Sequence, residues 1–361
     1  MYHLTLVRYM HRVYFWTFFI IILLSSCSKS DTQISISCEE NHVGNNIIKW
    51  ETTPYKEGVV QVYTGTSPYN ILENKPIAEA KISDQRMIII NNNPSVRSFY
   101  SVVFNNEKRI IVGSRNINFP NVENFRDLGG YESQTERKKT KWGYIYRTGK
   151  LDRINDKGIA RLKSLGIKTI VDLRPSEEMV NNSLLSANFN IVRLPINTKD
   201  TKGLLNEVLD QSINRRELKS YMKKVYVDIA RNNNVQFKEV FKLLLDESNY
   251  PIVFACESGK RQVGVLSSYI LSALGVNQDV IMVDYKRSND FIDMSEANTY
   301  ASNLPNSAQE ALTALVLAQP DYLEAAIQEV KSSYGNVDSF FKEGLGLTDK
   351  DIVKLRSMLL E

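Results

Sequence analysis

Short apolar runs separated by turn residues characterise the chain between residues 35 and 118. The runs that we predict to be β-strands are Ile47–Trp50, Val59–Tyr63, Met87–Ile90, Phe99–Phe104 and Arg109–Val112. Pro, Asn, Ser and Thr gather between them. Short strands at regular intervals are typical of an antiparallel β-sandwich. We therefore predict an all-β domain over residues 28–118, in which Ser28–Ser37 serve as a polar tether.

Beyond residue 118 the pattern changes to strands that alternate with helices. Ile167–Leu173 is a continuous apolar run that predicts a buried strand, and Gly166 before it suits the end of a helix. The apolar positions with helical spacing are Ile159, Leu162, Leu165, Leu218, Met222, Val225, Tyr226, Ile229, Phe237, Val240, Phe241 and Leu244. This alternation predicts an α/β domain over residues 119–361, with a mainly parallel sheet flanked by helices.

The N-terminus has the features of an export signal. Arg8 and Arg12 precede the apolar run Val13–Leu24, which is shorter than the roughly 20 residues that span a bilayer. The segment Leu24–Cys27 then resembles the lipobox of bacterial lipoproteins, which implies acylation of Cys27. We predict a signal peptide over residues 1–27 and an exported protein anchored in the membrane by lipid. An ordinary signal anchor with an incidental cysteine is the alternative.

Composition excludes several kinds of site. The 45 basic and 41 acidic residues are scattered and give a net charge of only +4, which indicates no nucleic-acid partner. The cysteines are Cys27, Cys38 and Cys256, and the histidines are His3, His11 and His42. Three dispersed cysteines predict neither a disulfide framework nor a zinc site. Because no histidine follows residue 42, nucleophile activation by histidine is excluded from the α/β domain, and we predict no metal and no cofactor there.

One junction in the α/β domain carries candidate chemistry. The predicted strand Pro251–Ala255 leads into a short loop with Cys256, and a helix follows from Val263 towards Gly275. Loop amides and a helix N-terminus together form a site for an anion, and they lower the pKa of a thiol placed there. Cys256 is therefore the candidate nucleophile. The candidate phosphate-binding residues of the loop are Glu257, Ser258, Gly259, Lys260, Arg261 and Gln262.

The two other interpretations of this loop are an ATP-binding loop and a cysteine with a purely structural role. An ATP-binding loop would need glycine five positions before Gly259 and serine or threonine after Lys260, but Phe254 and Arg261 stand there. That interpretation is excluded. A buried cysteine at the end of a strand, without chemistry, remains open on the loop alone.

Further motifs accompany the loop in a fixed order. They are Asn124–Tyr131, Tyr146–Leu151, Leu165–Arg174 with Glu177, Asp284–Asn289, Tyr334–Gly335 and Gly344–Leu347. With the loop, they resemble the bacterial tyrosine/serine phosphatase family of the protein-tyrosine-phosphatase superfamily over residues 119–361. The resemblance implies hydrolysis of phosphate monoesters through a Cys256 phospho-enzyme, with a phosphorylated protein, lipid or small molecule as substrate. The N-terminal domain is similar to immunoglobulin-like and fibronectin-type-III modules.

The loop departs from the family pattern H-C-x-x-G-K-D-R-T-G at four positions. Ala255 replaces the histidine, Arg261 the aspartate, Gln262 the arginine and Val263 the threonine. Losing the arginine fork removes a charged clamp on the phosphoryl oxygens, a loss of about 10³-fold or more in rate by analogy. Losing the aspartate removes a proton donor, whose contribution is roughly 10²–10⁴-fold.

Other residues are candidates to replace the lost groups. Asp172 and Asp127 are the candidate proton donors, and Arg174 is expected at the same sheet edge as the loop. Both acids have an alternative role, which is to bond backbone groups or to pair with Arg174 and Arg126.

Three functions stay open on the sequence. They are an active phosphatase, a phosphate-binding pseudo-phosphatase with poor turnover, and a surface lipoprotein whose β domain does the binding. We expect the β domain to be a spacer or docking surface that separates from the α/β domain near residues 113–122.

Overall fold

The computed structural model describes residues 32–41, 43–91, 93, 96–119, 121–179, 182–291 and 295–361. Cys27 and the predicted signal peptide lie outside these residues. Among the residues that are described, no helix combines the length and the apolar character needed to cross a membrane.

The first described region, which we call the β unit, covers residues 33–113. Its strands are β1 (Gln33–Glu40), β2 (Asn46–Thr53), β3 (Val59–Gly65), β4 (Ala78–Lys81), β5 (Arg86–Ile89), β6 (Phe99–Phe104) and β7 (Lys108–Gly113). They form two antiparallel sheets with the orders β1-β2-β5 and β4-β3-β6-β7. The five predicted strands are confirmed. The predicted tether is wrong from Gln33 onwards, because β1 pairs with β2 along its whole length.

The two sheets of the β unit share one apolar core. Trp50 of β2 is fully buried there against Phe104 of β6, with ring centroids 6.2 Å apart. Its indole N–H donates to the carbonyl of Ile82 at 2.8 Å, so the polar atom of this buried ring is satisfied. Likeness to fibronectin-type-III modules stays a prediction.

The C-terminal region is a mixed α/β fold. Its sheet has the order β11-β10-β12-β9-β8, in which β8 is antiparallel and the other four strands are parallel. These strands are β8 (Arg126–Asp127), β9 (Ile145–Thr148), β10 (Thr169–Asp172), β11 (Asn190–Arg193) and β12 (Ile252–Ala255). The helices are α2 (Asp156–Ser164), α3 (Ser183–Ser186), α4 (Leu204–Leu209), α5 (Arg215–Asn232), α6 (Asn234–Leu244), α7 (Gln262–Ala273), α8 (Gln278–Lys286), α9 (Ser295–Ala301), α10 (Asn306–Val316), α11 (Pro320–Tyr334), α12 (Val337–Ser339) and α13 (Asp349–Leu359). The predicted alternation of strands and helices is confirmed.

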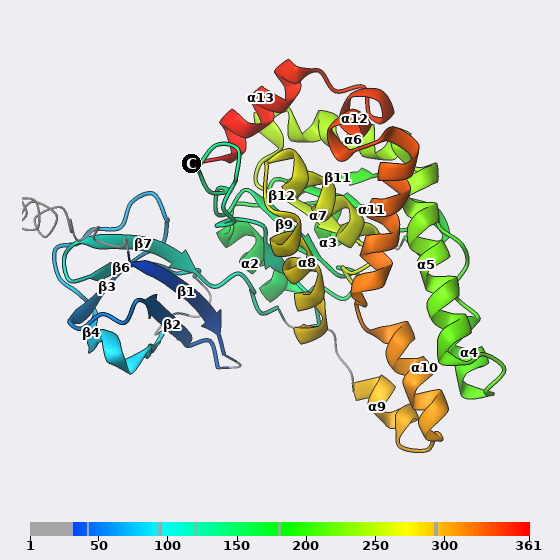
Figure 1. The fold of residues 1–361 in the computed structure, drawn as a ribbon, viewed down its shortest axis with the longest axis horizontal. Coiled ribbons are helices and arrows are strands. Elements are labelled where there is room, and N and C mark those ends of the chain that lie inside the picture. Colours follow the sequence, from blue (N-terminus) through cyan, green and yellow to red (C-terminus); the bar gives the residue numbers. More distant parts are fainter. Residues whose placement is uncertain are drawn as a thin grey trace, which may run out of the picture.

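Helices cover both faces of this sheet. On β10, Ile170 packs with the apolar residues of α2 and α3, whereas Val171 packs with the larger cluster formed by α5 to α8 and the C-terminal helices. Successive side chains of a strand point to opposite faces, so β10 needs apolar residues at both positions. In Figure 1 the β unit lies to one side of this helix-covered region.

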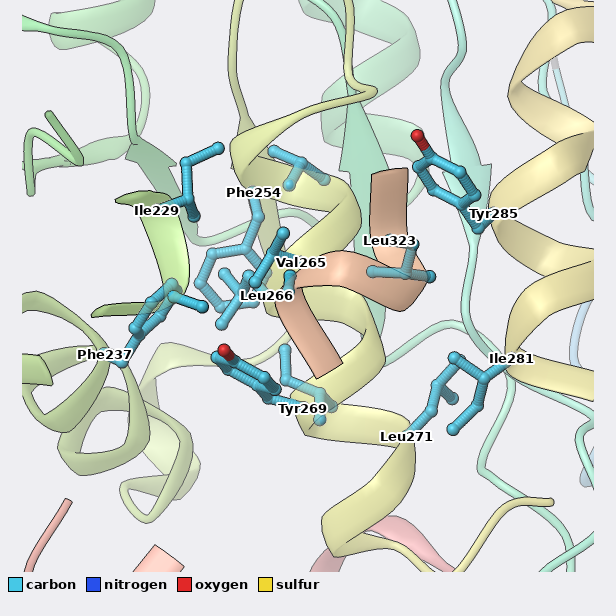
Figure 2. Packing of buried hydrophobic residues seen from close by; sticks show 14 of the residues in the cluster. Ile229, Phe237, Phe254, Val265, Leu266, Tyr269, Leu271, Ile281, Tyr285 and Leu323 are labelled. Carbon is cyan, nitrogen blue, oxygen red and sulfur yellow. The ribbon is translucent and has the colours of Figure 1, made fainter. Parts of the chain in front are cut away.

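Helix α7 lies at the centre of the larger cluster (Figure 2). Tyr269 of α7 meets Phe237 of α6 edge-on, with ring centroids 5.0 Å apart. Every residue of α7 except Ser272 is buried, which explains why its sequence has no charged residue and no single apolar stripe. The helix that follows the cysteine loop is therefore fixed on all sides.

Candidate active site

A tight loop joins the end of β12 to the start of α7 and carries Cys256. The turn depends on Gly259, whose φ of +65° lies in the left-handed region. A Cβ atom at this position would lie 2.6 Å from the carbonyl carbon of Thr148 in β9. The close approach of loop and strand therefore requires glycine.

The loop and helix α7 present backbone donors to the thiol of Cys256. The backbone N–H groups of Val263 and Gly259 act on its sulfur in the direction that favours the thiolate. The sulfur also lies at the N-terminus of a 12-residue helix, where the helix dipole favours negative charge. This is the arrangement of an anion site with a cysteine at its centre.

Burial nevertheless raises the pKa of the Cys256 thiol. Only 1% of the residue is exposed, and desolvation outweighs the opposing effects of the Val263 amide, Arg261, Arg147 and the Gly259 amide. The amides lower the thiol pKa as the sequence predicts, but burial outweighs them, so the predicted net lowering of this pKa is wrong. The sequence reveals the donors around the sulfur but not the depth at which the fold buries it.

Two carbonyls of the loop, those of Ser258 and Gly259, accept hydrogen bonds from residues outside the loop. The side-chain amide of Asn124 donates to the carbonyls of Ser258 and Gly259, both at 3.0 Å. Arg147 of β9 donates to the carbonyl of Gly259 at 2.7 Å. We call the side of the loop that Asn124 and Arg147 contact its back. With these carbonyls fixed there, the amides of Gly259 and Val263 are the backbone groups that act on the sulfur.

Arg147 and Asn124 are themselves held by a buried group of charged residues around Asp284. Asp284 of α8 accepts hydrogen bonds from Arg147 at 2.6 Å and from the hydroxyl of Tyr131 at 2.8 Å. Arg126 lies 3.6 Å from the same carboxylate and donates to the side-chain oxygen of Asn124. Burial alone would raise the pKa of Asp284, but the two guanidinium groups lower it to about 2. Burial lowers the pKa of Arg126 to about 10.

The side chain of Lys260 is hydrogen-bonded to the end of helix α10. Its ammonium donates to the backbone carbonyls of Leu315 and Val316, at the end of α10. The residue is buried, which lowers the pKa of its amine to about 7. Lys260 therefore joins the loop to α10.

Arg261 and Gln262 occupy the positions at which the loop departs from the family pattern. Arg261 is partly exposed and donates to the hydroxyl of Thr201 at 2.6 Å. Gln262 is 2% exposed, and its side-chain oxygen is buried without a hydrogen-bond partner among the described residues. One buried polar group at the start of α7 is thus unsatisfied among the described residues, which is costly in a protein interior.

Comparison with known proteins decides the family. The model of the tyrosine phosphatase family matches residues 117–361, which is more than half of the chain and includes the whole loop. This chain belongs to the tyrosine phosphatase family.

Relatives of this phosphatase are distant but extensive. A Cupriavidus necator protein named among the tyrosine-protein phosphatases is 26% identical over 258 residues, covering 69% of this chain and 90% of the relative. The triple specificity protein phosphatase PtpB of Mycobacterium tuberculosis is 25% identical over 276 residues, covering 67% of this chain and 98% of that protein. The solved catalytic core of the PP-IP phosphatase SIW14 of S. cerevisiae has 16% identity and a TM-score of 0.28, covering 44% of this chain and 86% of that structure.

Asp172 and Arg174 of the phosphatase lie at the predicted sheet edge but are paired with each other. Asp172 pairs in register with Ala255, directly before the cysteine. Arg174 donates to Asp172 at 2.7 Å and to Asp152 at 2.7 and 2.8 Å. These residues line a cavity of about 420 Å³ that reaches Ala255. Arg174 is therefore held by two carboxylates.

Asp127 lies away from the cysteine. Its carboxylate accepts a hydrogen bond from Arg97 of the β unit at 2.5 Å, and both side chains are buried. The suggested pairing of Asp127 with Arg126 is wrong, because Arg126 points instead to Asn124 and Asp284. Adjacent residues of a strand face opposite sides of the sheet, so the two side chains part.

Glu257 points outwards from the loop. Its carboxylate pairs with Lys150, and both side chains are about two-fifths exposed. Its negative charge is thus compensated at the surface. Ser258 contributes its carbonyl, which is bonded to Asn124.

Several residues that shape the site were missed as functional candidates. They are Asn124, Tyr131, Arg147, Asp152 and Asp284. A usable signal was present, because Arg147 interrupts an apolar strand and Asp284 lies on the buried side of a helix. Charged residues are almost never fully buried unless paired, so each of them required a partner.

Proposed function

We propose that this protein hydrolyses phosphate monoesters through Cys256. The thiolate attacks phosphorus, a sulfur–phosphorus bond forms, and the bond to the leaving oxygen breaks as that oxygen takes up a proton. Water then cleaves the phosphocysteine to phosphate and free thiol. The observation that carries the proposal is the place of Cys256 in the tight loop between β12 and the N-terminus of α7, where the backbone N–H groups of Gly259 and Val263 favour its thiolate.

The positive charge at the site comes from Arg261, one position before the arginine of the family pattern. Arg261 acts on the Cys256 thiol in the direction that lowers its pKa, and we propose that it supplies part of the attraction for the phosphoryl group. Gln262 supplies a neutral amide where the family has a bidentate cation. We therefore propose a turnover well below that of a phosphatase with the complete loop.

We propose Asp172 as the proton donor. It lies next to Ala255 at the end of β10 and borders the cavity beside the loop. Its carboxylate accepts from the backbone N–H and the guanidinium of Arg174. Proton donation to a leaving oxygen requires this pairing to loosen when substrate enters.

The substrate class and the location of the protein are proposals as well. A phosphorylated protein, lipid or small molecule is the class we propose, in line with the names of the relatives. We also propose that the chain is exported and anchored in the membrane through an acylated Cys27. Replacement of Cys27 by alanine should release the protein from the membrane fraction or block its processing. An unprocessed N-terminus found in the cytoplasm would contradict this.

A second candidate function is binding of a phosphorylated ligand with little turnover. The observation that favours it is Gln262, which is buried at the start of α7 and brings no charge to the loop. The amides of the loop would still hold a phosphate.

Hydrolysis of an aryl phosphate by the wild type and by Cys256→Ser separates the candidates. An active phosphatase loses turnover in the variant by at least about 10³-fold, because the alcohol is a far weaker nucleophile. Equal background rates, combined with saturable binding of inorganic phosphate to both proteins, would support the binding function instead.

A further inference from the structure

Arg97 of the β unit reaches into the C-terminal region. Its guanidinium donates to Asp127 at 2.5 Å and to the hydroxyl of Tyr146 at 3.2 Å. A third hydrogen bond runs to the carbonyl of Ser114 at 2.9 Å. Arg97 thus connects the loop before β6 with both β8 and β9.

Aromatic rings enclose the same guanidinium. Its central carbon lies 4.5 Å from the ring centroid of Phe99 in the β unit and 5.5 Å from that of Trp142 in the C-terminal region. Only 8% of the Arg97 side chain and none of the Asp127 side chain is exposed. A desolvated pair of this kind is favourable only when its geometry is fixed, so the two regions are held in register here.

Asp127, which Arg97 holds in place, is also hydrogen-bonded to the backbone of two nearby glycines. Its carboxylate also accepts the N–H groups of Gly129 at 2.7 Å and Gly143 at 2.8 Å. One side chain of the β unit therefore fixes the short strand β8 and the turn before β9.

The segment fixed in this way is the one that supports the cysteine loop. Arg126 directly precedes Asp127 and orients the amide of Asn124, which binds the carbonyls of Ser258 and Gly259. The path from the β unit to the loop thus runs through hydrogen bonds and through the backbone that joins Arg126 to Asp127.

We propose that Arg97 is a positioning residue for the cysteine loop, and that the β unit is a working part of the catalytic region rather than a spacer. By fixing Asp127, Arg97 keeps Asn124 and Arg126 in place, and with them the loop carbonyls that Asn124 binds. For its kinetic test this inference rests on the proposed phosphatase function.

A surface ion pair of the same unit provides the matched control. Arg109 of β7 pairs with Glu73 at 2.7 Å, but its side chain is 55% exposed and lies at the surface of the β unit. Arg109→Met removes the same charge from the same unit without touching Asp127. The contrast with Arg97→Met isolates the buried position.

The experiment compares four full-length variants with the wild type. They are Arg97→Met, Arg97→Lys, Arg97→Met combined with Asp127→Asn, and Arg109→Met. The double variant avoids an unpaired buried carboxylate, so it is expected to fold even if Arg97→Met does not. Steady-state hydrolysis of an aryl phosphate gives kcat and KM, and amide hydrogen exchange is followed on peptides that cover residues 256–264.

We expect the double variant to lower kcat by about tenfold while KM changes less than about twofold, and to speed exchange of the loop amides. Arg97→Lys should restore part of kcat, which a loss of folded protein alone would not show. If kcat and loop exchange in the double variant match those of Arg109→Met, the proposal is overturned. If the wild type is no faster than Cys256→Ser, the proposed function fails, and loop exchange alone then decides the role of Arg97.

Discussion

The two sides of the cysteine loop differ in how completely their polar groups are hydrogen-bonded. The back is the side contacted by Asn124 and Arg147, and the front is the side formed by Arg261 and Gln262. On the back, Asn124 and Arg147 bind the loop carbonyls. On the front, Arg261 reaches Thr201, and Gln262 leaves a buried oxygen unpaired. The back preserves the shape of an anion site, whereas the front changes its charge. Loop geometry and catalytic electrostatics are therefore separate properties, and one can persist while the other is altered.

The largest expected effect is on the back of the loop. Arg147→Met leaves Asp284 with one arginine instead of two and removes one of the two hydrogen bonds to the carbonyl of Gly259. Breaking a buried pair typically costs 3–5 kcal/mol, and we expect a loss of that order in the free energy of unfolding, measured in urea. Lys242→Met is the control, because it breaks an exposed pair with Glu239 and should cost at most about 1 kcal/mol. A similar small loss for both variants would show that the back is not a structural anchor.

Acid titration tests the same anchor without mutation. The pKa of Asp284 in the folded protein is about 2, below the value near 3.9 of an unfolded aspartate. A depressed folded pKa stabilises the protein above the unfolded pKa, and the gain is lost as pH falls from about 4 towards 2. We expect the carboxylate to account for roughly 2–3 kcal/mol of that loss. Arg147→Met combined with Asp284→Asn should unfold with a flatter pH dependence over this interval. An unchanged slope would count against the ionised buried carboxylate.

Restoring the family's residues at positions 261 and 262 should change the free energy less than the two changes above. Arg261→Asp with Gln262→Arg restores the residues of the family loop and leaves Lys260 and Gly259 alone. We expect aryl phosphate hydrolysis to rise at least about tenfold, which corresponds to roughly 1.4 kcal/mol of transition-state stabilisation. Gln262→Arg alone should gain less, and adding Cys256→Ser must abolish the gain. A repaired loop that binds phosphate but stays inert would place the defect elsewhere in the pocket.

The smallest effect is expected at Glu257. Its carboxylate is paired with Lys150 at the surface and is about two-fifths exposed. Glu257→Gln should change kcat/KM by less than about twofold, since solvent screens exposed charges. A gain of tenfold would mean that this charge does oppose the incoming phosphate.

Much of the fold was predictable from local pattern. The strands around Trp50 and Val102 and the helix through Met222 follow from apolar spacing. The strand, loop and helix around Cys256 were recognised because three local signals coincide there. Strand β1 was missed, since its polar residues are only partly buried at a sheet edge.

The remainder depended on contacts between distant parts of the chain. Arg147 and Asp284 are 137 residues apart, and Arg97 and Asp127 are 30 apart in different regions. The spacing of residues in a single sequence does not show which distant residues pair with each other. The depth of the Cys256 thiol has the same origin, because it depends on how helices from the end of the chain cover the loop.

The position of Trp142 gives the molecule a built-in optical reporter. The sequence has three tryptophans, of which Trp16 lies outside the described residues. Trp50 is enclosed in the β unit, whereas Trp142 lies against the guanidinium groups of Arg97 and Arg115 where the two regions meet. Parting of the regions would bring water to the indole of Trp142 and shift its emission to longer wavelength, while that of Trp50 stayed in place. Replacing Trp50 by phenylalanine would thus leave a chain whose fluorescence follows the opening of this contact.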